Sequence, residues 1–132
     1  MYKILIVGEK WSACNPEFGY SALHHNFIGS LASTGLAEIQ TFFYDAYVHD
    51  THQRCDSALL EKCRLERPDF VILRLVRGTD LNPSLDTIGE IRQQTTAKVA
   101  SIHSDTHDQI AADWMNDVSC HVDLVVVQDC YS

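Results

Sequence analysis

Five short apolar segments recur along the chain, and each has the length of a β-strand. They cover residues 2–7, 37–44, 69–75, 98–103 and 122–127. The first is apolar at nearly every position rather than at every second one, which is typical of a strand covered on both faces of a parallel sheet. The pattern therefore predicts five short strands of this kind.

Between these segments, apolar residues recur three or four positions apart, as they do along the buried face of a helix. The predicted helices have their buried faces at Tyr20, Leu23, Phe27 and Leu31, at Cys55, Leu59 and Cys63, at Leu85, Ile88 and Ile91, and at Ile110, Trp114 and Val118. Gly35 ends the first helix and Pro68 stops the second. Asn82, with a proline after it, is typical of a helix start. We expect loops at 45–52 and 76–81.

Strict alternation of strands and helices predicts an α/β fold. We expect a Rossmann-like three-layer sandwich, in which a five-stranded parallel sheet of order 3-2-1-4-5 lies between four helices. The length suits a single domain over 1–132. No covering helix follows the strand at 122–127, and a parallel edge strand without one is half exposed. We therefore expect a protein partner or a second domain at this side, the chain then being the N-terminal half of a longer protein.

Composition and charge exclude several classes of function. With 45% hydrophobic and 21% charged residues, the chain has the composition of a globular domain. Eighteen acidic residues against ten Lys and Arg give a net charge of −8, which argues against nucleic acid and anionic membranes as partners. No apolar run approaches the ~20 residues that span a bilayer. Five cysteines, an odd number without a C-x-x-C pair, favour a reducing, cytoplasmic location over a disulfide framework.

Ligands of α/β sheets bind at the carboxyl ends of the strands, so the loops after the strands hold the candidate residues. The first loop begins with Gly8, Glu9, Lys10 and Trp11, and it contains neither a G-x-G-x-x-G fingerprint nor a P-loop. Lys10 would supply a cation, and Trp11 and Phe18 would supply stacking surfaces. The alternative is a surface loop whose aromatic rings pack on the edge of the domain.

The loop after the third strand offers Arg77, which would either meet an anionic ligand or pair with Asp80 or Asp86. A response-regulator receiver carries an acidic pair after its first strand and an aspartate at the end of its third. Here those places hold Glu9 with Lys10, and the run Leu-Val-Arg that ends at Arg77. The sequence therefore lacks the residues of a receiver phosphorylation site.

The densest polar cluster lies at 103–108, where the fourth strand leads into the fourth helix. Its two histidines and two carboxylates could bind a divalent metal, although their spacing matches no standard zinc motif; they are His103, Asp105, His107 and Asp108. The helix N-terminus could instead hold an anion. A third alternative is ordinary capping, with Ser104 or Asp105 as the cap and Asp108 in the first turn.

Four segments, taken in order, resemble the N-terminal domain of GT-B glycosyltransferases of the spore-maturation type. They are KILIVG at 3–8, ERPDFVI at 66–72, KVASIHSDTHD at 98–108 and HVDLVVVQD at 121–129, and they span most of the chain. The resemblance implies a domain that recognises a small-molecule or glycan acceptor within a larger enzyme or assembly. The donor of such enzymes sits mostly on a second domain, so no donor residue and no cofactor is expected here.

The resemblance also implies site residues. The acceptor would contact the loops that contain Gly8, Glu9, Lys10, Trp11, Arg77 and Asp108. If a base takes the proton from an acceptor hydroxyl, the candidates are Asp105, His107 and His103.

Two other functions remain open from the residues alone. One is a stand-alone binding or regulatory module of receiver-like shape without a phosphoacceptor, which would meet a partner near the fifth strand. The other is a small metal-dependent hydrolase that would use the four side chains at 103–108.

Overall fold

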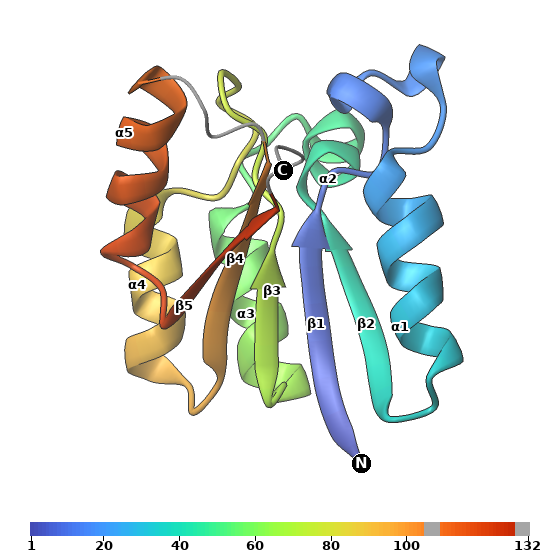
Figure 1. The fold of residues 1–132 in the computed structure, drawn as a ribbon, viewed down its shortest axis with the longest axis vertical. Coiled ribbons are helices and arrows are strands. Elements are labelled where there is room, and N and C mark those ends of the chain that lie inside the picture. Colours follow the sequence, from blue (N-terminus) through green and yellow to red (C-terminus); the bar gives the residue numbers. More distant parts are fainter. Residues whose placement is uncertain (105–108, 129–132) are drawn as a thin grey trace.

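The computed structural model describes residues 1–104 and 109–128 and shows one sheet between two layers of helices (Figure 1). The strands are β1 (Tyr2–Gly8), β2 (Ala37–Phe43), β3 (Phe70–Leu73), β4 (Lys98–Ser104) and β5 (Leu124–Gln128). The α-helices are α1 (Gly29–Ser33), α2 (Tyr44–Thr51), α3 (Asp56–Glu66), α4 (Leu85–Gln94) and α5 (Gln109–Ser119). Shorter helical segments are η1 (Ser12–Cys14), η2 (Pro16–Phe18) and the π-helical η3 (Leu23–Ile28).

All strand pairs are parallel, and the strands lie in the order β2-β1-β3-β4-β5. The α/β class and the five-stranded parallel sheet are confirmed, but the predicted order 3-2-1-4-5 is wrong. The physical reason lies in the second and third strands. Polar side chains alternate along β2, none of its residues is buried, and it forms an edge. The wholly apolar β3 pairs with both β1 and β4 inside the sheet.

The prediction of four helices is also wrong, because α2 forms where a loop was expected. Half of residues 44–51 are polar, and their apolar face is short, since it consists of Tyr44, Tyr47 and Val48. Tyr44 lies in the main core and Tyr47 packs against it. At the ends of the helix, Asp45 lies in the first turn and His52 closes the last turn in the left-handed conformation. In addition, the first predicted helix is divided into η3 and α1.

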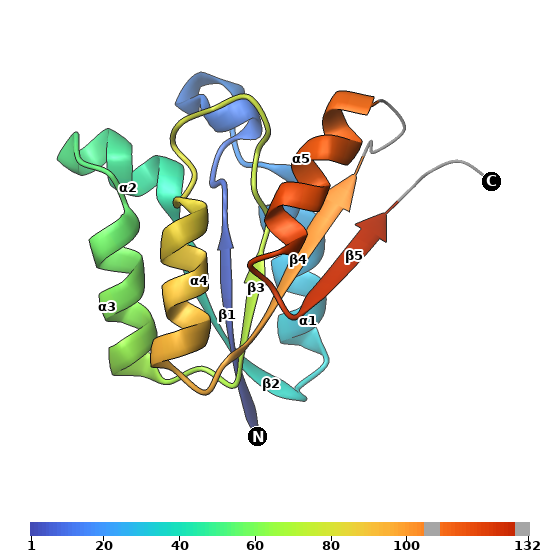
Figure 2. The same cartoon turned by 90° about the vertical axis from the view of Figure 1, so that its left-hand side faces the viewer.

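Helices α3, α4 and α5 cover one face of the sheet, and η3 and α1 lie against the other (Figures 1 and 2). The main core fills the space beneath the first group. Strand side chains such as Leu5, Val71 and Val99 meet Leu59 and Ile88 of α3 and α4 there. Cys55, the N-cap residue of α3, and Cys63 within α3 are buried in this core, as predicted, and the described cysteines are free.

The opposite face is covered only over part of its width. Side chains alternate between the faces of a sheet, and Val99 and Val125 belong to the main core or pack on it. Their neighbours in β4 and β5 therefore point to the α1 side, where Leu124 is 59% and Val126 is 41% exposed. This strip of β5 is the half-exposed edge that the sequence predicted, and what covers it stays a prediction.

No helix within residues 1–104 and 109–128 is long and apolar enough to cross a membrane.

Candidate functional site

The strand order reverses between β1 and β3, and in sheets of this kind ligands bind at the carboxyl ends of the strands beside that reversal. Polar and charged side chains gather at this edge. Four of these residues follow β1, β2 or β3 directly, and the fifth lies near the end of β4. They are Glu9, Tyr44, Asp45, Arg74 and His103.

Asp45 is almost fully buried and holds the loop after β1 in place. Its carboxylate accepts hydrogen bonds from the backbone N–H groups of Lys10 (2.8 Å) and Trp11 (3.1 Å). It also accepts one from the N–H of Ala46, at 2.8 Å, in its own helix. Three backbone donors therefore compensate the buried negative charge.

Glu9 and Tyr44 form a second buried group beside Asp45. The Tyr44 hydroxyl donates to the carbonyl of Arg74 at 2.9 Å and lies 3.4 Å from Glu9 Oε2. Burial raises the pKa of Glu9, and the positive charge of Arg74 opposes that rise. Burial together with the charges of Asp45 and Glu9 raises the pKa of the nearby Cys14 thiol to about 12, so this cysteine stays protonated at neutral pH.

Arg74 is the first residue after β3, and its backbone N–H continues the ladder by donating to Val7 at 2.8 Å. Leu73 and Leu75 point into the main core, so alternation directs Arg74 to the opposite face. No hydrogen bond or ion pair within residues 1–104 and 109–128 engages its guanidinium group. The charge acts at a distance instead: it opposes the rise that burial causes in the pKa of Glu9, and it adds to the effect of burial in lowering the pKa of His103.

The Arg74 side chain lines a pocket of about 310 Å³ between η3 and the carboxyl ends of β3 and β4. The other lining residues are Ala22, Leu23, Asn26, Phe27 and Ile102. Gly8 allows the helix to lie so close to the sheet, because a Cβ there would come within 2.1 Å of Leu23 Cδ2. The predicted ligand residue Gly8 therefore has a packing role that the sequence alone did not indicate.

The structure brings some predicted site residues into this edge and directs others away. Glu9 lies within it, and Lys10 contributes its backbone N–H to Asp45. The Trp11 ring packs against the exposed His49 of α2, with 5.4 Å between ring centroids, which favours the alternative of an aromatic ring packed on the edge of the domain. Arg77 is exposed in the loop, three residues beyond Arg74.

His103 faces the core beneath α5. Its Nε2 lies 2.9 Å from the Ser101 hydroxyl, and its ring meets Trp114 edge-on at 5.3 Å. Burial and the charge of Arg74 lower its pKa, so the imidazole is neutral at pH 7. The other predicted catalytic, ligand or metal residues of this segment, Asp105, His107 and Asp108, lie outside the described residues. Among the described residues, no group of three or more His, Cys, Asp or Glu side chains could hold a metal ion.

Sequence reasoning missed Arg74 because it extended the third strand to Leu75 and so counted the loop from Val76. In the structure the ladder pairs Leu73 with Val7, and the next residue is the arginine. The available signal was the first charge after the apolar run FVIL.

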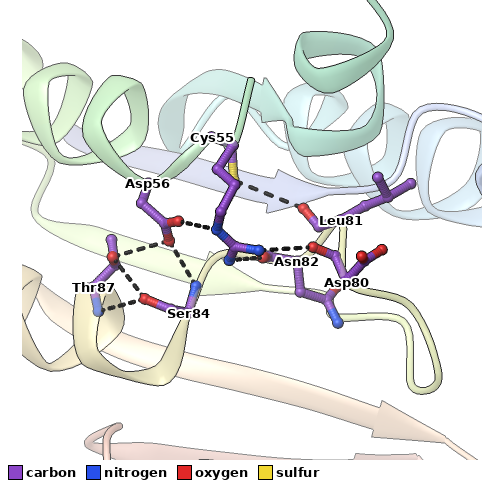
Figure 3. Close-up of polar contacts among 8 residues, drawn as sticks. Cys55, Asp56, Asp80, Leu81, Asn82, Ser84 and Thr87 are labelled. Carbon is purple, nitrogen blue, oxygen red and sulfur yellow. Dashed lines mark hydrogen bonds and ion pairs between the residues drawn. The ribbon is translucent and has the colours of Figure 1, made fainter. Parts of the chain in front are cut away.

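On the other face, the loop that follows β3 is tied to the start of α3 (Figure 3). Asp56 accepts from the N–H of Ser84 at 2.7 Å and from the Thr87 hydroxyl at 3.0 Å. Arg54 donates to Asp56 at 2.8 Å and also to two loop carbonyls, those of Asp80 and Asn82. Burial acts to raise the pKa of Asp56, but the hydrogen bonds outweigh it and lower the pKa.

The same network corrects the predicted start of the helix that follows. Ser84, not Asn82, is the cap of α4, and its hydroxyl accepts from the N–H of Thr87 at 3.2 Å. The Asn82 side chain instead bonds the backbone of Val76 on both sides, as a donor at 2.7 Å and as an acceptor at 3.1 Å. Asn82, the polar residue before proline, therefore stabilises the loop after β3 and does not cap the helix.

Comparison with known proteins supports the fold and goes no further. No protein-family model matches the sequence, and no curated protein matches it. Among solved structures, the chain is similar to a two-component response regulator from Clostridium difficile, with a TM-score of 0.59 and 14% sequence identity. The match covers 97% of this chain and 84% of the other. At that identity it shows a shared α/β fold, and the glycosyltransferase resemblance stays an untested prediction.

Proposed function

We propose that this chain is a receiver-like binding module that works without a phosphoacceptor. The observation that carries the proposal is Arg74. A receiver has an aspartate at the end of its third strand, and here the first residue beyond β3 is an arginine. A guanidinium group cannot accept a phosphoryl group to form an acyl phosphate, so this edge of the sheet is suited to binding rather than to phosphoryl transfer.

The surrounding charges support the same proposal. Asp45 already holds three backbone donors. Glu9 lies close enough to Arg74 for the positive charge to oppose the rise in the pKa of Glu9. Arg74 therefore supplies a positive charge within the chain beside the buried Glu9.

A phosphorylation assay tests the proposal. The chain is incubated with acetyl phosphate and Mg²⁺, and its intact mass is measured; a receiver domain that has its aspartate is treated in parallel as the positive control. We expect the control to gain a phosphoryl group and this chain to remain unmodified. A phosphoryl adduct on a carboxylate of this chain contradicts the proposal.

A further inference from the structure

We infer that the pocket beside Arg74 binds a small organic carboxylate with an apolar body. The inference deepens the proposed binding function and rests on it, because it assigns Arg74 to ligand recognition. It starts from the position of the pocket, which opens at the carboxyl ends of β3 and β4, beside the reversal in strand order. Its volume of about 310 Å³ lies at the lower end of the range of small-molecule sites.

The lining of the pocket defines the kind of ligand. Leu23, Phe27 and Ile102 form apolar walls, while Arg74 and Asn26 supply the polar groups. A guanidinium group presents parallel N–H donors that match the two oxygens of a carboxylate. An inorganic anion would leave the apolar walls without a partner, and a neutral apolar ligand would leave the charge without one.

Arg74 has hydrogen-bonding capacity that other arginines of this chain have used. Arg54 and Arg92 donate to carboxylates at 2.8 and 2.9 Å. Arg74 is half-buried, yet no described residue accepts from its guanidinium group. A partly desolvated cation without an acceptor is costly, and a carboxylate in the pocket would remove that cost.

Two acidic side chains near Arg74 would oppose an anion, and the structure weakens both effects. The Asp45 carboxylate is compensated by its three backbone donors. Burial raises the pKa of Glu9 and so favours its neutral form. The remaining titratable neighbours, Tyr44 and His103, are neutral at pH 7, because burial raises the pKa of the phenol and lowers that of the imidazole.

The backbone beside the pocket provides an independent observation. Leu23 and Phe27 belong to η3, a π-helical segment, and π-helical turns are rare and frequently occur at functional sites. Leu23, Asn26 and Phe27 are three and four positions apart in this segment, and all three line the same pocket.

Titration followed by amide-resolved NMR tests the inference. The probes are phenylacetate and isovalerate, each compared with its neutral amide on the full chain. We expect both carboxylates to shift the signals of residues 22–27, 74 and 102 in a saturable way, and their amides to bind at least tenfold more weakly. The variant Arg74→Gln should bind the carboxylates at least tenfold more weakly and should have a thermal midpoint at least as high as that of the wild type. Arg67→Gln removes the same charge from the opposite end of the sheet and should bind as the wild type does.

Any of four results overturns the inference: no saturable shift at millimolar carboxylate, equal affinity for the amides, unchanged affinity in Arg74→Gln, or shifts confined to residues outside the pocket. The proposed function fails separately, through the phosphorylation assay. A chain that is not phosphorylated and does not bind carboxylates would leave the proposed function standing and reject only the pocket.

Discussion

At the carboxyl ends of the strands, the two faces of the sheet differ in whether their charged side chains have partners within the described residues. Under α3 and α4, Arg54 donates to Asp56, and the two side chains hold the loop after β3 by four further hydrogen bonds (Figure 3). On the η3 face, Arg74 meets an open pocket and no described acceptor. The same loop takes part in both, because it begins at Arg74 and ends at Ser84. Charges that are paired internally stabilise the fold, whereas a charge left open can recognise a ligand.

The largest expected effect comes from disrupting the hydrogen-bond network of Asp56 under α3 and α4. Asp56→Ala removes the acceptor for Ser84, Thr87 and Arg54, so we expect a loss of about 2–3 kcal/mol in the free energy of unfolding. Urea denaturation measures it. Asp50→Ala, which removes an exposed carboxylate from α2, is the control and should change stability by less than about 0.5 kcal/mol. Equal losses in the two variants would show that the network adds no stability.

A substitution on the η3 face, beside the Arg74 pocket, should lower the free energy of unfolding by less. Gly8→Ala places a methyl group 2.1 Å from Leu23 Cδ2, so the buried Leu23 side chain must move, at about 1–2 kcal/mol of unfolding free energy. The matched control is Gly29→Ala, where a Cβ meets nothing within 4 Å and φ is −61°, so the chain should become slightly more stable. Thermal unfolding of both variants measures the difference. A neutral Gly8→Ala would mean that the Leu23 side chain moves aside without loss of packing.

The charge of Asp56 gives a smaller, pH-dependent effect. Its folded-state pKa is lowered from the ordinary 3.8, so its contribution is present above that value and is lost as the pH falls through the folded-state pKa. Asp56→Asn keeps an oxygen acceptor and removes the charge. We expect the stability gap between wild type and this variant to be widest near pH 7 and to close below about pH 4. A gap that does not change with pH would assign the contribution to hydrogen-bond geometry alone.

The smallest expected effect is on the affinity of the Arg74 pocket for a carboxylate. Glu9 and Arg74 interact electrostatically, and a negative charge on Glu9 opposes a bound carboxylate. Glu9→Gln should therefore tighten phenylacetate binding a few-fold, whereas Arg74→Gln should weaken it. For the same reason, wild-type affinity should rise as the pH falls through the raised pKa of Glu9, and the variant should lose this dependence. NMR titration at several pH values measures both. Weaker binding by Glu9→Gln would mean that Glu9 orients Arg74 rather than competing for its charge.

Sequence patterns predicted what depends on burial and missed what depends on neighbours. The apolar runs of β1 and β3, together with Cys55 and Cys63, identified the α/β class and the core, because buried residues recur at the period of the strand or helix that contains them. The place of β2 in the sheet, the helix at 44–51 and the end of β3 depend on contacts with segments far away in sequence. Because the strand ends at Leu73, earlier than the sequence pattern indicated, Arg74 was not recognised as the first residue after it. The role of the Arg54–Asp56 ion pair depends likewise on Ser84, which is distant in sequence and was not predicted to contact it.

The hydrogen bonds of Asp45 also carry information about how the chain folds. They join this carboxylate to backbone N–H groups 34 and 35 residues earlier. The loop after β1 therefore cannot reach its final conformation until β2 has paired and α2 has formed, since closing such a span precedes the contact. On the ribosome, where the chain emerges from its N-terminus, we expect residues 9–21 to stay accessible to proteases until the segment through Asp45 has left the exit tunnel.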